Sequence, residues 1–197
     1  MKKFLFPKIF VVFFSLFGFS LGVSAQIDAF NNGDMIINVG VGIGTYINHN
    51  LKLSSGDVLF NEYNYSMTIP PITGSFEYGV LDLFDGKGGV GIGGYLAYIL
   101  FKGRDRNHTV NDFNLGDFII GPRGLFHYQF VDKLDTYAGV MVGYDIVSYS
   151  QAGAAEGSKF CSAFFVGARY YITNNIGVFG ELGYGVSPLQ LGLCYKF

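Results

Sequence analysis

The chain has 197 residues, of which 50% are hydrophobic and only 14% are charged, and its formal net charge is -2. This composition excludes a disordered chain, which is poor in apolar residues and rich in charge, and the acidic balance argues against a nucleic-acid binder. The 29 glycines do not recur at every third position, so a collagen-like repeat is excluded too. The length fits one domain.

Residues 1–25 are predicted to be a signal peptide. Three lysines accompany an apolar run, Ile9–Phe19, that is short for a membrane-spanning helix. Small residues at 23–25 then place the predicted cleavage before Gln26. An N-terminal membrane anchor is the alternative interpretation. The sequence thus predicts an exported protein whose mature domain comprises residues 26–197.

The mature domain is predicted to be all-β. Apolar and other residues alternate over segments of ten or so residues, which is the period of a half-buried strand. The predicted strands are 35–46, 70–84, 88–101, 115–130, 134–149, 159–172, 176–185 and 188–197. They are long compared with the five or six residues usual in soluble proteins, whereas a tilted membrane strand needs about 9–11.

The connections alternate between short and long. Short turns are predicted at 85–87, 131–133 and 173–175, and longer polar loops at 47–69, 102–114 and 150–158. This alternation is typical of an outer-membrane barrel. We therefore expect a closed eight-stranded antiparallel up-and-down transmembrane β-barrel with its termini in the periplasm and its long loops outside. The short connection near 185–187 is the exception on the loop side.

The positions of the charged residues indicate which face of each strand points into the lumen and which faces lipid. A lipid-facing Arg or Lys costs about 2–4 kcal/mol at the bilayer midplane, so we place these residues in the lumen. The alternate positions are then apolar in each strand. The predicted lumen charges are Glu77, Arg123, Asp145, Arg169, Glu181 and Lys196. We interpret them as a paired structural network, because buried charges need partners; an ion path is the alternative.

One ion pair is predicted from a turn. The turn at 173–175 pairs Ile172 with Ile176, which makes Arg169 and Glu181 diagonal neighbours on the inward face. Gly167 leaves space between them. We expect a nitrogen–oxygen distance within the usual ~4 Å criterion.

Other motifs carry less weight. Gly89–Gly94 matches a dinucleotide fingerprint, but no helix follows it, so no nucleotide site is predicted. Cys161 and Cys194 lie toward opposite ends of their strands and are predicted to be free. No zinc-like spacing occurs, and no metal or cofactor is expected. The loose candidates for catalysis are His108, Thr109 and Asp112; a solvated polar loop is the preferred interpretation.

The C-terminal strand carries a resemblance to a known family. The chain ends in Leu193, Tyr195 and Phe197 at alternate positions, which resembles the signal read by the barrel-assembly machinery. Further matching segments are Pro70–Ile72, Phe76–Gly79, Val166–Tyr171 and Gly180–Gly185. With these segments the mature chain resembles the small outer-membrane protein β-barrel family, including the OmpX type and the barrel half of OmpA.

The resemblance implies a location and a kind of role. It implies a protein of the Gram-negative outer membrane, in contact with outer-membrane lipids and lipopolysaccharide, with no nucleic-acid partner. It also implies a non-enzymatic structural or surface-interaction role, with an extracellular ligand contacting loops 47–69, 102–114 and 150–158. A narrow, porin-like solute or lipid conduit is the alternative, followed by a lipid-modifying enzyme.

Overall fold

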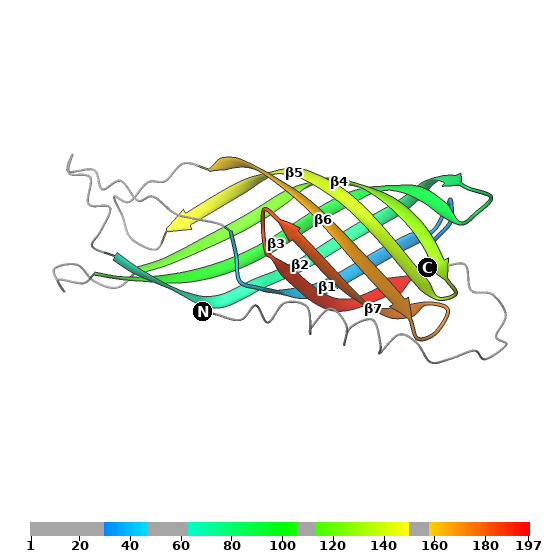
Figure 1. The fold of residues 1–197 in the computed structure, drawn as a ribbon. Coiled ribbons are helices and arrows are strands. Elements are labelled where there is room, and N and C mark those ends of the chain that lie inside the picture. The colour runs from blue at the N-terminus through cyan, green and yellow to red at the C-terminus, as the bar shows by residue number, and fades with distance from the viewer. Residues whose placement is uncertain (1–29, 47–62, 106–112, 150–157) are drawn as a thin grey trace, which may run out of the picture.

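The protein folds as one closed β-barrel. The structure, a computed structural model, describes residues 30–46, 63–105, 113–149 and 158–197. The strands are β1 (Met35–Ile43), β2 (Tyr63–Leu83), β3 (Gly88–Asp105), β4 (Phe113–Val131), β5 (Leu134–Tyr149), β6 (Lys159–Tyr171), β7 (Ile176–Tyr184) and β8 (Leu189–Lys196). They follow one another around the barrel, and β1 pairs antiparallel with β8 (Figure 1). Within the described residues, no helix has the length and apolar character to cross a membrane.

The two ends of the barrel differ. Tight turns at 84–87, 132–133 and 172–175 gather at one end, together with the start of β1 and the C-terminus; we call it the turn end (Figure 1). Lys87 N donates to Phe84 O, and the two central residues of this turn, Asp85 and Gly86, have φ of 55° and 84°, the left-handed conformation that a primed hairpin turn needs. At the opposite end, the loop end, lie the strand ends that flank the predicted long loops. Their segments 47–62, 106–112 and 150–157, the predicted signal peptide and its cleavage site lie outside the described residues.

The eight predicted strands are confirmed, with corrections at their ends: β1 ends at Ile43 instead of residue 46, and three other strands extend into the predicted loops. Tyr63–Ile69, Lys102–Asp105 and Phe113–Asn114 were predicted to be loop, and they are strand. Pro70 and Pro71 suggested that β2 begins there, yet the strand runs through them. Proline is tolerated in a strand at an edge or a bulge. Both conditions hold here, because pairing with β1 ends at Ile72 and the register with β3 shifts between Ile69 and Ile72.

The predicted parity of the strands is also correct. Glu77, Arg123, Asp145, Arg169 and Glu181 are all buried in the lumen, and the alternate positions are exposed and apolar. Val140 is 61% exposed and Val166 57%, although they lie in the middle of their strands. The outer face of the barrel is therefore apolar, as in a protein surrounded by lipid.

Glycines make room for large side chains in the lumen. A Cβ at Gly167 would lie 2.6 Å from the Tyr137 ring, and one at Gly91 would collide with the Glu77 carboxylate. Eight strands enclose a space that side chains just fill, so a bulky group on one strand requires a small one beside it.

The lumen has two halves. Toward the loop end it holds an apolar cluster, formed by Tyr95, Ala97, Ile99, Phe101, Leu115, Ile119, Met141 and Val186. Toward the turn end it holds buried charges and a smaller apolar cluster, formed by Phe30, Ile36, Tyr171, Phe179 and Cys194. Both cysteines are free, as predicted.

Candidate functional site: the charged lumen

Four charged side chains form a closed cycle in the turn-end half of the lumen. The Arg169 guanidinium contacts the Glu77 carboxylate and lies 2.9 Å from Asp135 Oδ2. His127 Nδ1 lies 2.9 Å from Asp135 Oδ1, and His127 Nε2 lies 2.5 Å from Glu77 Oε1. We call these four residues the charged ring. Their side chains come from β2, β4, β5 and β6, and each is at most 1% exposed.

His127 is placed as a cation. Both of its ring nitrogens face carboxylate oxygens, and an imidazole offers a proton on both nitrogens only as imidazolium. The contact with Asp135 has hydrogen-bond geometry, whereas the contact with Glu77 is an ion-pair approach without it. With His127 charged, two cations balance two anions, and the charged ring is neutral.

Neutral polar groups extend the charged ring. Arg169 Nε donates to Asn38 Oδ1 at 3.2 Å, and Asn38 Nδ2 donates to the Ser75 hydroxyl at 2.8 Å. Arg169 therefore uses all three of its nitrogens, on Asn38, Asp135 and Glu77. A fully buried guanidinium needs this degree of satisfaction to offset its lost hydration.

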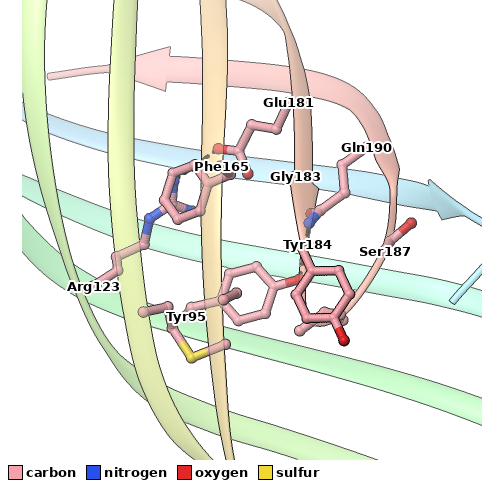
Figure 2. Close-up of a pocket in the computed structure, with 11 residues that line it drawn as sticks. Tyr95, Arg123, Phe165, Glu181, Gly183, Tyr184, Ser187 and Gln190 are labelled. Atoms are coloured by element: carbon pink, nitrogen blue, oxygen red, sulfur yellow. Dashed lines mark hydrogen bonds and ion pairs between the residues drawn. The ribbon is translucent and has the colours of Figure 1, made fainter. Parts of the chain in front are cut away.

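A second ion pair lies next to the charged ring, toward the loop end. Arg123 Nη2 donates to Glu181 Oε1 at 2.7 Å, and the Tyr137 hydroxyl donates to the same oxygen at 2.9 Å. The Arg123 guanidinium also lies 4.3 Å from the centre of the Phe165 ring. Figure 2 shows these two side chains beside Glu181. Such stacking suits the planar, weakly hydrated guanidinium group.

The predicted Arg169–Glu181 ion pair is wrong, although its register is right. Arg169 opposes Phe179 and Glu181 opposes Gly167, as predicted. The space over Gly167 is filled by Tyr137, whose ring lies 4.4 Å from the Arg169 guanidinium. Tyr137 thus separates the two charges and bonds to Glu181 itself. Arg169 pairs instead with carboxylates that reach it from β2 and β5.

The structure places the other predicted lumen charges apart from this cluster. Asp145 is fully buried toward the loop end, where Lys159 Nζ lies 3.8 Å from its carboxylate. Lys196 lies at the rim of the turn end, 3.5 Å from Asp34 Oδ2 and 5.2 Å from the centre of the Tyr171 ring. The predicted set of six is therefore spread over three locations.

The residues of the predicted assembly signal lie on the outer face of β8 and at its end. Leu193 is 62% exposed, Tyr195 43% and Phe197 62%. The Tyr195 and Phe197 rings pack edge to face with their centres 4.8 Å apart. Their recognition by an assembly machinery stays a prediction.

Several residues of the site were missed from sequence. Asp135 and Asp117 have the inward parity of Asp145 and Arg123, so alternation alone could have found them; both are buried. His127 shares the inward parity of Arg123, so alternation indicates its place in the lumen but not its partners. Phe30 lies before β1, outside every predicted strand, and no periodic signal marked it. The loose catalytic candidates His108, Thr109 and Asp112 lie outside the described residues.

A pocket lies beside the Arg123–Glu181 pair. It is small, with a volume of about 20 Å³, and lies between these two residues and the turn that joins β7 to β8. Its polar lining includes Gln190, which accepts a hydrogen bond from the Tyr95 hydroxyl at 3.3 Å (Figure 2). Among the described residues, no group of three or more His, Cys, Asp or Glu side chains is arranged to hold a metal ion.

The barrel is similar to solved outer-membrane proteins. OprG from Pseudomonas aeruginosa aligns with a TM-score of 0.52 at 12% identity, over 87% of this chain and 99% of that one. Ail, the attachment invasion locus protein of Yersinia pestis, aligns with a TM-score of 0.50 at 14% identity, over 84% of this chain and 99% of that one. No family model and no curated protein matches the sequence. The chain therefore has the fold of the small eight-stranded outer-membrane barrels.

Proposed function

We propose that the protein is an integral outer-membrane barrel that presents the loop end of its β-sheet to a protein partner at the cell surface. The exposed apolar face supports a membrane location, because an apolar band around a barrel fits the hydrocarbon region. The export signal and the contacts with outer-membrane lipids and lipopolysaccharide are part of this proposal.

The filled lumen makes the conduit the weaker candidate. The charged ring and the Arg123–Glu181 pair occupy the turn-end half, and no side chain of either is more than 3% exposed. Ions crossing at this level would have to separate buried pairs, which costs several kcal/mol. These charges therefore serve to hold the barrel closed.

Four strands continue past the apolar band at the loop end. β2 has 21 residues, β3 18, β4 19 and β5 16, whereas about 9–11 residues cross a membrane. Near their loop ends the outward positions become polar, at Ser66, Lys102, Asn114 and Ser148. Figure 1 shows these strands extending beyond the turn between β7 and β8. They form a projecting sheet outside the proposed membrane.

The observation that carries the proposal is the open edge of this sheet. β1 pairs with β2 only as far as Val41 and Ile72, so no described strand covers Tyr63–Ile69 on that side. An uncovered strand presents N–H and C=O groups to which an extended segment of another chain can add. Ail, which has the same fold, is by name an attachment protein. We infer a partner that binds by adding a strand to β2.

The test blocks the edge without altering the rest of the sheet. Lysine blunts a strand edge, so Ser66→Lys with Thr68→Lys is the test variant. Asn114→Lys is the matched control, because Asn114 is also exposed on the projecting sheet but belongs to the inner strand β4. Peptides that bind the folded protein in lipid nanodiscs are selected from a phage-displayed library of random extended peptides.

The proposal expects peptides whose binding falls at least tenfold in the Ser66/Thr68 variant and is unchanged in Asn114→Lys. Equal losses in both variants, or peptides that bind independently of β2, would contradict strand addition at this edge. A photo-crosslinker at position 66 locates the bound peptide directly.

A further inference from the structure

The segment before β1 folds into the turn end of the barrel. Phe30 is 4% exposed and belongs to the buried cluster that contains Ile36, Tyr171, Phe179 and Cys194. A residue outside every strand is therefore part of the lumen. Ordering a segment outside the strands costs conformational entropy, which contacts of that segment must offset.

Hydrogen bonds hold that backbone against β2. Gly33 N donates to Gly79 O and Gly79 N donates to Asp34 O, both at 2.9 Å. Asn32 N donates to Asp82 Oδ1 at 2.6 Å, and Asn31 N donates to Asp34 Oδ2 at 2.9 Å. Phe30–Asp34 is thus tied to one wall of the barrel, next to the rim.

Two glycines on the wall make space for the segment. A Cβ at Gly79 would collide with the Asn31 carbonyl oxygen, and one at Gly89 would lie 3.0 Å from Phe30 Cδ1. Both glycines lie on the inward face, where a side chain would displace the Asn31 backbone or crowd the Phe30 ring. The space that Phe30 occupies therefore depends on the absence of side chains at these two positions.

Phe30 covers the charged ring. Its ring stacks on His127 with the centres 3.8 Å apart and an angle of 13° between the planes. His127 is contacted by Glu77 from β2, by Asp135 and Tyr137 from β5, and by Phe30 from the segment before β1. An aromatic face over an imidazolium is attractive and excludes water from its charge.

We propose that Phe30–Asp34 is a stopper that closes the turn end of the lumen and shields the charged ring from solvent. The stopper is anchored through its backbone to β2 and seated through the Phe30 ring on His127. It is independent of the projecting sheet, so it stands whether or not the surface-interaction role does.

Cys194 is a built-in reporter for the stopper. Its thiol is buried in the same cluster as Phe30, and the chain has only one other cysteine, Cys161, toward the loop end. In a Cys161→Ser background, the rate at which a water-soluble maleimide labels Cys194 in lipid nanodiscs measures access through the turn end. Phe30→Ala is the test variant, and Phe84→Ala removes an outward aromatic ring, 58% exposed, at the same end.

The stopper predicts that Phe30→Ala accelerates labelling at least tenfold and that Phe84→Ala leaves the rate unchanged. Folding of each variant is checked by the heat-dependent gel mobility of the barrel. If Phe30→Ala fails to fold, Phe30→Leu carries the test, because leucine keeps the segment apolar but cannot stack flat on His127; a smaller acceleration is expected. An unchanged rate in a folded Phe30 variant overturns the proposal.

Discussion

The two halves of the lumen are stabilised by different interactions. In the turn-end half, charged side chains meet across the barrel, and each finds partners of opposite sign or a hydrogen bond. In the loop-end half, Ala97, Ile99, Leu115 and Ile119 are all 0% exposed and pack as an apolar core. The turn-end half is held by specific pairing, which fails when one partner is removed. The loop-end half is held mainly by non-directional burial, which scales with the area removed from water, although Asp117 and Asp145 are also buried there.

The largest effect is expected at the shared cation of the charged ring. Arg169→Met leaves Glu77 and Asp135 buried with only His127 between them, which should cost about 3–5 kcal/mol of folding free energy. Urea titration in lipid vesicles measures this cost. Arg123→Met removes a cation that pairs with one carboxylate rather than two, so it should cost less. If both substitutions reduce the folding free energy equally, the charged ring is not the main source of stability in the turn-end half.

The apolar, loop-end half should be destabilised by a substitution that creates a cavity. Ile119→Ala should cost about 2–5 kcal/mol, because the fully buried side chain leaves a void that the core does not refill. Ile120→Ala is the control on the same strand: its side chain is 48% exposed on the outer face, where lipid takes up the space. If the two substitutions reduce the folding free energy in lipid vesicles by the same amount, the loop-end half is not a packed core.

Tyr137 links the charged ring to the Arg123–Glu181 pair, because its ring lies on the Arg169 guanidinium and its hydroxyl donates to Glu181. Tyr137→Phe keeps the ring over Gly167 and removes the donor to Glu181, at about 1.5–3 kcal/mol for a bond to a charged acceptor. Tyr144→Phe removes an exposed donor to the Ser158 carbonyl and should change stability little. Thermal unfolding of the two variants in one lipid distinguishes them, and a Tyr137 effect as small as that of Tyr144 would refute the link.

The smallest effect is expected at the rim. Lys196→Ala removes an ion pair with Asp34, whose side chain is 20% exposed. Pairs in contact with water contribute about 0–1 kcal/mol and weaken with salt. The cost in urea titration should therefore shrink between low and high salt, while that of Arg169→Met should persist. A salt-independent cost above 2 kcal/mol would place Lys196 in the buried set.

The sequence by itself determined the number of strands, their facing and the tight turns. A period of two places Glu77 and Arg169 on the same side as every other buried charge, whatever the neighbours are. The turn at 173–175 sets the register of β6 and β7, so the opposition of Arg169 and Phe179 was readable too. These features depend on local alternation and on turn geometry, which single segments carry.

Only the closed barrel decided the contacts that cross the lumen, whereas Asp135 stands directly opposite Arg169 on the adjacent strand β5. Arg169 lies on β6 while Glu77 lies on β2, 92 residues away in the chain, and they meet across the lumen rather than along a hairpin. Tyr137 came between Arg169 and Glu181 because Gly167 left it room, and Phe30 entered the lumen from a segment without periodicity. Hairpin register specifies adjacent strands alone, whereas closure brings distant strands within side-chain reach.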